Sequence, residues 1–236
     1  MLEPVRAAFG LLTRLPVRPA PVRPEGVWAF PLAGLAVGAL AGLGYWGALS
    51  LGLPSGPAAA LALTASILLT GGLHEDGLAD CADGLWGGFE RAGRLEIMRD
   101  SRIGSYGVLA VGTSLLIRWS TLVVIGPWGL IIAAVASRAA MVWPMMRLPH
   151  ARQDGLARLS GRPSGRAFGL ACGVAALLVL PLAGWSLLWL VPAMALAAQC
   201  ATAVARAKIG GQTGDVLGAA QQLSEMAALL VLAALV

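Results

Sequence analysis

Charged residues are scarce in this sequence. They make up 12% of its 236 residues, whereas hydrophobic residues make up 58% and the mean hydropathy is +0.77. A soluble domain carries about 25% charged residues, so this composition excludes an ordinary soluble protein. It predicts an integral membrane protein.

Cysteine is rare as well, with only Cys81, Cys172 and Cys200. Their spacing matches no zinc motif, and an odd, scattered set makes no disulfide framework. We interpret them as small packing residues. The sequence also has no separate soluble region, internal repeat or low-complexity tail, which predicts one transmembrane domain over residues 1–236. The first 24 residues lack a continuous apolar stretch, so we do not expect a cleavable signal there.

Long apolar runs take the place of the missing charge. Most of them approach the ~20 residues that a helix needs to cross a ~30 Å hydrocarbon core. They predict an all-α, polytopic membrane bundle of about six or seven transmembrane helices. The expected spans are roughly 28–50, 57–72, 106–125, 128–146, 167–184, 186–204 and 217–236.

The basic residues fall on one side of this predicted bundle. Fifteen of the seventeen Lys and Arg residues lie in the N-terminal arm and in segments 73–105, 147–166 and 205–216, while the alternate connectors carry none. The positive-inside rule makes the basic side cytoplasmic, with the N-terminus inside and the C-terminus outside. The net charge of +5 follows from this bias, so we do not expect nucleic-acid binding.

Residues 71–107 hold seven of the twelve acidic residues. Asp76, Asp80 and Asp83 are spaced by four and then three residues, which puts three carboxylates on one face of a helix. Such carboxylates repel one another unless a cation lies between them, and Mg²⁺ takes few protein carboxylates together with substrate phosphates. The pattern indicates a magnesium site, with a solvated helix face as the alternative. His74 is a candidate general base, hydrogen-bond donor or helix-end residue.

Two further segments on the same side carry polar side chains. Asp100, Ser101 and Arg102 follow one another, and they offer a carboxylate for a metal and a guanidinium for phosphate. Residues 210–215 read Gly-Gly-Gln-Thr-Gly-Asp, a Gly-rich turn that can hold phosphate through backbone N–H groups at a helix start. A plain turn explains that segment equally well. Arg152 adds a further cation.

Two arginines, Arg118 and Arg138, fall inside expected spans. A charge at that depth costs at least about 2.5–3.5 kcal/mol unless it is paired. For Arg118 we expect an internal salt bridge or snorkelling. For Arg138 the expected partner is the acidic stretch or a substrate phosphate, on a cavity open to the cytoplasm. Glu75 points away from the face of Asp76 and is expected at the surface or the lipid interface.

Several of these segments resemble the cobalamin synthase family, whose members are also called adenosylcobinamide-GDP ribazoletransferases. The most specific block is GGLHEDGLADCADGLWGG, and LEIMRDSRIGSYGVLA and GGQTGDVLGA support it. FGLLTRLPV, FPLAGLAVGAL and ARQDGLA extend the likeness over nearly the whole chain. Glu75 departs from it, since an apolar residue is expected there.

The resemblance implies a magnesium-dependent transferase in the bacterial cytoplasmic (inner) membrane, with its active site facing the cytoplasm. The implied reaction belongs to the final stage of cobalamin synthesis. It transfers the adenosylcobinamide-phosphate unit from adenosylcobinamide-GDP to α-ribazole or its 5′-phosphate and releases GMP. By this resemblance, the residues expected to act in catalysis are His74, Asp76, Asp80, Asp83 and Asp100. Those expected to bind substrate are Ser101, Arg102, Thr213 and Gly214, to which we add Arg138 and Arg152. Those expected to bind Mg²⁺ are Asp76, Asp80, Asp83 and Asp215.

Other classes remain as alternatives. A magnesium-dependent membrane prenyltransferase would need two DDxxD-like clusters, and the sequence has one imperfect cluster. The CDP-alcohol phosphotransferases share the acid-rich Asp-Gly pattern loosely and offer a mechanistic analogy. A transporter, the non-enzyme alternative, would place acids at mid-membrane in broken helices. The sequence leaves open which residue is the general base and whether the protein, surrounded by membrane lipid, forms oligomers.

Overall fold

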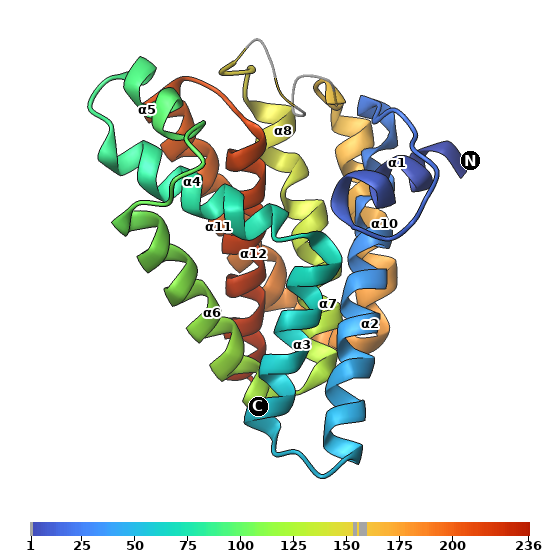
Figure 1. Cartoon of the computed structure of the whole chain (residues 1–236). Coiled ribbons are helices and arrows are strands. Elements are labelled where there is room, and N and C mark those ends of the chain that lie inside the picture. The colour runs from blue at the N-terminus through green and yellow to red at the C-terminus, as the bar shows by residue number, and fades with distance from the viewer. Residues whose placement is uncertain (1, 153–154, 156–159) are drawn as a thin grey trace.

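The computed structural model describes residues 2–152, 155 and 160–236 (Figure 1). It confirms the all-α class, because within these ranges the only β-type pairing is an isolated bridge between His150 and Gln212. Arg158 and most of the ARQDGLA segment lie outside them. The helices are α1 (Leu2–Leu12), η1 (Pro24–Ala29), α2 (Phe30–Ser50), α3 (Ser55–Thr70), α4 (Leu73–Gly87), α5 (Arg91–Ile97), α6 (Ser105–Ile125), α7 (Pro127–Ala140), α8 (Val142–Arg147), α10 (Gly165–Ala183), η2 (Gly184–Ser186), α11 (Leu187–Ile209) and α12 (Gly214–Ala234).

Two consecutive glycines turn the chain between α3 and α4. Gly71 and Gly72 have φ values of 68° and 69°, a left-handed conformation that glycine adopts without steric cost. The axes of α3 and α4 consequently differ by 87°. α4 has 15 residues, or about 22 Å at 1.5 Å per residue, which is too short to cross the hydrocarbon core. It lies across the end of the bundle that also carries α5 (Figure 1).

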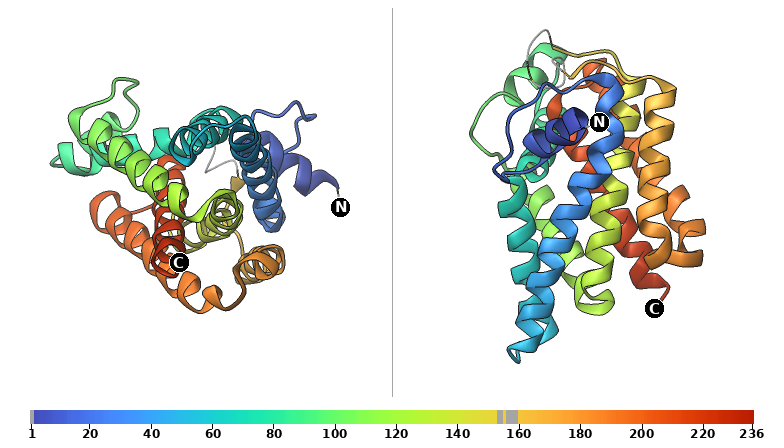
Figure 2. Two further views of the ribbon diagram at one scale, coloured as in Figure 1. Left: turned by 90° about the horizontal axis from the view of Figure 1, so that it is seen from below. Right: turned by 90° about the vertical axis from the view of Figure 1, so that its right-hand side faces the viewer.

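The described residues contain five stretches that are long and apolar enough to cross a membrane, and the bent α3–α4 pair would add a sixth. One of the five, Gly165–Ile209, has 45 residues, and Figure 2 shows that it consists of two separate helices, α10 and α11. Each of the seven predicted spans therefore contains a helix. The number seven is reached only if α10 and α11 count separately and the 16-residue α3 counts as a span.

Small residues let these helices pack closely. A Cβ at Gly34 of α2 would collide with the backbone of Ala134 in α7, and a Cβ at Gly38 would lie 2.7 Å from the Cα of Ile131. Hydrocarbon gives helices no hydrophobic reason to associate, so close backbone approach through small residues is a main source of attraction within a bilayer. Glycine at these two positions therefore fixes α2 against α7.

α12 lies at the centre of the bundle, where it packs against α4, α6, α7, α8 and α11 (Figure 2). The sequence predicts a weak last span because Gln221, Gln222 and Glu225 interrupt it. The structure instead has a continuous helix of 21 residues with all three side chains buried. Their partners lie on neighbouring helices, as described below, and a polar side chain is tolerated in such a place once it is hydrogen-bonded.

Candidate active site

Two glycines let α4 and α12 cross in close contact. A Cβ at Gly77 would lie 2.9 Å from the carbonyl oxygen of Asp215, and a Cβ at Gly218 would lie 3.3 Å from the Cα of His74. A side chain at Gly77 would therefore require the backbone to move. The crossing places the acidic face of α4 against the first turn of α12.

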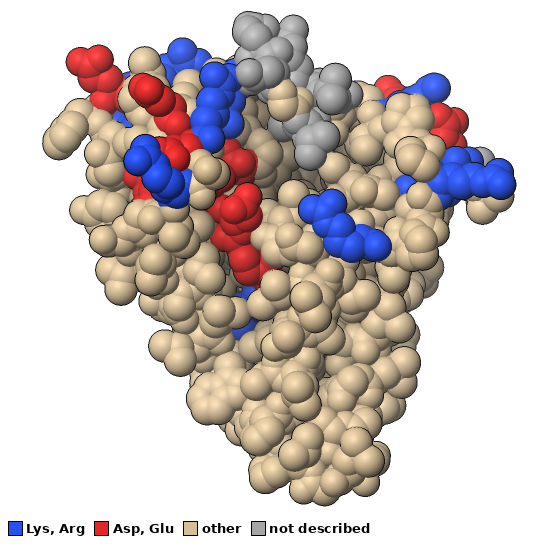
Figure 3. Space-filling model, viewed as in Figure 1, with Lys and Arg blue, Asp and Glu red and all other residues tan. Residues whose placement is uncertain are grey.

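Asp76, Asp80 and Asp215 form an acidic cluster at this crossing. Asp76 is exposed, Asp80 is half-buried, and the side chain of Asp215 is 21% exposed. Burial, followed by the negative charges of Asp215 and Asp76, raises the pKa of Asp80 from 3.8 to about 7, although Arg152 acts in the opposite direction. The cluster therefore holds more negative charge than the nearby arginine offsets. Figure 3 shows acidic side chains lining a hollow at this end of the molecule, bordered by basic ones.

Backbone pairing holds Arg152 beside the acidic cluster. The N–H of Ala151 donates to the carbonyl of Gln212 at 2.9 Å. The next side chain, Arg152, lies with its Nη1 3.5 Å from Oδ2 of Asp215, and its Nη2 donates to the carbonyl of Leu95 at 3.1 Å. A guanidinium has five N–H donors in a planar fork, so Arg152 is suited to contact a phosphate oxygen next to the carboxylates.

The predicted Gly-rich turn forms the start of α12. The hydroxyl of Thr213 accepts the N–H of Val216 at 3.3 Å, an N-cap interaction. The same hydroxyl donates to Oδ2 of Asp215 at 3.0 Å. Gly214 is exposed, and a Cβ there would meet no atom within 4 Å. A helix N-terminus, with its partial positive charge, therefore lies directly beside the acidic cluster.

Asp83 has a different environment from the other two aspartates of α4. Its Oδ2 accepts the N–H of Gly104 at 2.7 Å, and its Oδ1 accepts the N–H of Gly107 at 2.9 Å. A Cβ at either glycine would collide with the carboxylate. Asp83 thus holds the first turn of α6, whose N-terminal N–H groups favour a negative charge. The sequence groups Asp83 with Asp76 and Asp80, but its two oxygens are already engaged.

Four charged side chains form a buried ion network inside the bundle: Glu75, Arg118, Arg138 and Glu225. Nη1 of Arg118 lies 2.7 Å from Oε1 of Glu75, and its Nη2 lies 2.8 Å from Oε1 of Glu225. Nη1 of Arg138 lies 3.9 Å from Oε2 of Glu225 and 2.8 Å from the carbonyl oxygen of Ala134. The network joins α4, α6, α7 and α12, and its two positive and two negative charges balance.

Amide and hydroxyl groups complete this network. The Nε2 of Gln222 donates to Oε1 of Glu75 at 3.1 Å, and Ser114 donates to Oε1 of Gln222 at 3.0 Å. Gln221 donates both to Glu225 and to the hydroxyl of Ser137. The polar residues of α12 therefore satisfy charges contributed by three other helices.

The buried ion network confirms one expectation and contradicts two. The internal salt bridge predicted for Arg118 is present. The surface position predicted for Glu75 is wrong, because the bend after α3 turns that side of α4 into the bundle. The expectation that Arg138 could pair only with the acidic stretch or a substrate phosphate is also wrong, because Glu225 is its partner and Arg138 is 1% exposed. Glu225, an acid within an apolar run, is the signal that could have identified this partner.

His74 is enclosed between the acidic cluster and the buried ion network. It is 1% exposed, and its Nε2 has no hydrogen-bond partner in the described part of the chain. Its backbone packs against Gly218 of α12. The exposed carboxylate of Asp76, two residues later, is the more accessible polar group.

Comparison with known proteins assigns the family. The family model described as cobalamin-5-phosphate synthase matches residues 4–233. The chain belongs to this family. Among its relatives, a protein of Bradyrhizobium diazoefficiens is 45% identical over 99% of this chain and 94% of its own length, and one of Mesorhizobium japonicum is 43% identical over 98% and 93%. Both are named adenosylcobinamide-GDP ribazoletransferase. No solved structure matches the chain.

The donor atoms of this cobalamin-5-phosphate synthase family member can be compared with the needs of Mg²⁺. Within the described residues, no three His, Cys, Asp or Glu side chains stand close enough together to hold one metal ion. A closed set of four aspartates is therefore not assembled. The acidic cluster nevertheless offers only oxygen donors, and burial together with the neighbouring charges of Asp215 and Asp76 raises the pKa of Asp80. This fits Mg²⁺, which is usually bound by one or two carboxylates, several waters and substrate phosphates.

The second predicted block forms an exposed turn before α6. Nη2 of Arg102 lies 2.6 Å from Oδ2 of Asp100, and the hydrogen bonds from Arg102 hold the pKa of Asp100 at about 2. The side chain of Arg102 is 87% exposed, and Ser101 is exposed too. Asp83, which anchors the start of α6, connects this turn to α4. Their expected contact with substrate stays a prediction.

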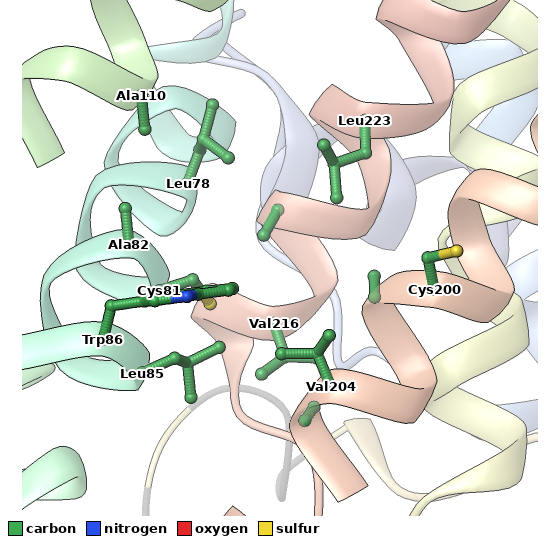
Figure 4. Close-up of a pocket in the computed structure, with 13 residues that line it drawn as sticks. Leu78, Cys81, Ala82, Leu85, Trp86, Ala110, Cys200, Val204, Val216 and Leu223 are labelled. Atoms are coloured by element: carbon green, nitrogen blue, oxygen red, sulfur yellow. The ribbon is translucent and has the colours of Figure 1, made fainter. Parts of the chain in front are cut away.

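An apolar pocket of about 260 Å³ lies against the side of α4 that carries Cys81 and Leu85 (Figure 4). Its other walls come from α6, α11 and α12, and no charged side chain lines it. None of the predicted site residues faces this pocket. The acidic cluster, which has the polar groups that orient a ligand, is the better candidate for the active site.

Proposed function

We propose that this protein transfers the adenosylcobinamide-phosphate unit of adenosylcobinamide-GDP to a hydroxyl of α-ribazole or of its 5′-phosphate, with release of GMP. This is a final-stage reaction of cobalamin synthesis, and the names of its relatives support it. The observation that carries the proposal is the close crossing of α4 and α12, which brings Asp76, Asp80 and Asp215 together beside Arg152.

The reaction forms one oxygen–phosphorus bond and breaks another. The acceptor hydroxyl oxygen attacks the phosphorus bonded to the corrinoid side, and the bridging oxygen leaves with GMP. In this proposal Arg152 holds the diphosphate oxygens together with N–H groups at the start of α12, and the position of Arg152 beside Asp215 supports that role. The carboxylates of the acidic cluster would hold Mg²⁺, which would neutralise charge on the diphosphate and on the departing GMP.

The acceptor hydroxyl must lose a proton during this step. A general base works best when its pKa lies near the working pH, and burial beside other carboxylates moves Asp80 into that range. We propose Asp80 as the proton acceptor, in preference to the enclosed His74, and leave Asp76 and Asp215 as the carboxylates that would hold the metal.

The charge bias supports a cytoplasmic position for this site. The acidic cluster lies at the end of the bundle where basic side chains gather (Figure 3), and the positive-inside rule makes that end cytoplasmic. We place the protein in the bacterial inner membrane with this site open to the cytoplasm, where nucleotide-activated substrates are found.

The test is GMP release from purified protein in lipid nanodiscs supplied with both substrates. Wild-type protein should release GMP only when both are present, which a prenyltransferase or a transporter would not do. Asp80→Asn should lower turnover by roughly 100-fold or more. Glu96→Gln, an exposed acid of α5 on the same side, is the matched control and should keep its activity. Normal turnover in Asp80→Asn would reject the proposed site.

A further inference from the structure

A groove lies between α10 and α11, away from the acidic cluster. These two helices diverge from η2, and α7 forms the floor of the groove between them, on the side of the bundle opposite α3 and α4 (Figure 2). The space is an open apolar groove of about 550 Å³, within the size range of ligand pockets. The described residues that line it are all uncharged, and they include Ala139, Cys172, Val179, Leu190, Met194 and Ala198.

Aromatic and amide side chains close the end of this groove nearest α8. The indole N–H of Trp143 donates to Oε1 of Gln199 at 2.9 Å, across from α8 to α11. The ring of Phe168 lies 5.6 Å from that of Trp143, which brings in α10. Trp and Tyr are enriched where hydrocarbon meets the lipid headgroups. This end of the groove therefore has the chemistry of the membrane interface.

Three exposed arginines gather just above that end, around the last turn of α8. The guanidinium of Arg147 stacks 5.1 Å over the ring of Trp143. Arg206 donates to the carbonyl of Arg147 at 3.3 Å, and Arg162 donates to the carbonyl of Met146 at 3.0 Å. We call Arg147, Arg162 and Arg206 the arginine triad.

The arginine triad has no acidic counterpart in the part of the chain that the structure describes, where none of its members forms an ion pair with a carboxylate. Capping the last carbonyls of α8 explains one hydrogen bond from Arg206 and one from Arg162. Each guanidinium has five N–H donors, so most of them remain available. Three like charges held together favour binding of an anion from outside the protein.

We propose that this groove binds one anionic phospholipid of the cytoplasmic leaflet. Its phosphate contacts the arginine triad, and one acyl chain lies along the groove between α10 and α11. A phospholipid joins an anionic group to a hydrocarbon chain through a short glycerol unit. These three parts match, in order, the arginine triad, the Trp143–Gln199 pair and the apolar walls of the groove. A helix from a second copy would fill the apolar part but would leave the arginine triad without an anion.

The test measures lipid retention by the full-length protein. Wild-type protein is purified from membranes, exchanged into mixed micelles holding phosphatidylglycerol and phosphatidylcholine at equal amounts, and examined by native mass spectrometry. One phosphatidylglycerol should stay bound in preference to phosphatidylcholine. The double variant Arg147→Gln/Arg206→Gln should lose this preference by about tenfold or more. Ala195→Phe, which narrows the groove without touching the arginine triad, should also lose bound lipid.

Arg166→Gln is the matched control. Arg166 is an exposed arginine at the start of α10, and it lies two residues, or about 200° of helical rotation, from the groove-lining Phe168. It should retain lipid as the wild type does. Thermal unfolding of each variant verifies that it is folded. Three results would each overturn the proposal. The wild type could retain both lipids equally, or retention could stay unchanged in Arg147→Gln/Arg206→Gln and in Ala195→Phe. The third is a wild-type dimer that Ala195→Phe converts to monomers.

Discussion

At the scale of single residues, the aspartates of α4 divide into two roles. Asp76 and Asp80 lie near Asp215, and burial, followed by the negative charges of Asp215 and Asp76, raises the pKa of Asp80 to about 7. Asp83 accepts two backbone N–H groups of α6 and is buried. The spacing of four and three residues predicts that all three are near one another. It does not reveal which of them another helix will engage.

A pair of substitutions should separate these roles. Asp83→Asn loses the charge that receives the N–H groups of Gly104 and Gly107, and a hydrogen bond to a charged group is worth about 1.5–3 kcal/mol. It should lower the free energy of unfolding of the protein by an amount of that order. Asp76→Asn removes an exposed carboxylate, so it should leave stability unchanged while GMP release falls. Thermal unfolding and turnover are measured on both; the reverse pattern would contradict the assignment.

The raised pKa of Asp80 predicts a pH dependence of metal-free protein. The pKa of its carboxyl is about 7 in the folded state and 3.8 in the unfolded state. Because the folded pKa is the higher one, the contribution to stability is full below pH 3.8 and is lost as pH rises toward 7. The unfolding temperature without metal should therefore fall between pH 5 and about 8, and Asp80→Asn should flatten that fall.

Added Mg²⁺ gives the complementary measurement. Binding requires the ionised carboxylate, so the rise in unfolding temperature caused by Mg²⁺ should be larger at about pH 8 than at about pH 6. Glu96→Gln, outside the acidic cluster, should behave as the wild type. A rise that does not change with pH, or turnover that survives EDTA, would contradict a metal at this site.

At the scale of elements, the position of α4 depends on two glycines that precede it and on one glycine within it. Gly71 and Gly72 turn it away from α3, and Gly77 lets it touch α12. Without the turn, α3 and α4 would form one long span with its acids inside the hydrocarbon. Without the close crossing, Asp215 would lie too far from Asp76 and Asp80 to act with them.

Gly77→Ala tests this crossing. The new methyl group would meet the carbonyl of Asp215 at 2.9 Å, so α4 and α12 must separate. We expect turnover to fall by at least about tenfold while the protein still inserts, because a displacement of about 1 Å at a catalytic site can cost roughly 100-fold. Gly93→Ala in α5, where a Cβ would meet nothing within 4 Å, is the matched control. Full activity of Gly77→Ala would show that the close crossing is not needed.

At the scale of the whole molecule, charge divides the protein into two parts. The acidic cluster lies at one end, open to water, and the buried ion network lies within the bundle and joins four helices. Its charges balance, so it can remain in an apolar interior. Glu75 belongs to α4 and Glu225 belongs to α12, so the network connects the two helices that cross at the acidic cluster. We infer that it keeps these two helices in register.

Breaking this network should have unequal effects at its two acids. Glu225→Gln leaves both Arg118 and Arg138 without that carboxylate, and removal of one partner from a buried ion pair costs about 3–5 kcal/mol. Glu75→Gln still leaves Glu225 paired with Arg118, so its cost should be smaller. Thermal unfolding in detergent gives both values. If Glu75→Gln proves the more destabilising, Glu225 is not the central anion.

The orientation of the molecule can be checked by labelling. In a variant without its three cysteines, Glu90→Cys places a single thiol at an exposed position just before α5, and Ser55→Cys places one at the half-buried first residue of α3, near the opposite end of the bundle. In intact cells, an impermeant thiol reagent should label position 55 and should reach position 90 only after the membrane is opened. Strong labelling at position 90 of intact cells, with none at 55, would invert the assigned topology.

The sequence by itself determined the membrane character, the all-α class, the positions of the spans and the family. These properties depend on local composition, on periodicity and on motifs that are contiguous in the chain. It also singled out Asp76, Asp80, Asp215 and Arg152, and the family resemblance, rather than their spacing, grouped Asp215 with the aspartates of α4. Only the tertiary structure decided that Asp83 holds α6 and that Glu225 pairs with both buried arginines. Such pairings depend on how each helix is rotated and which helix packs beside it, and side-chain packing between distant segments sets both.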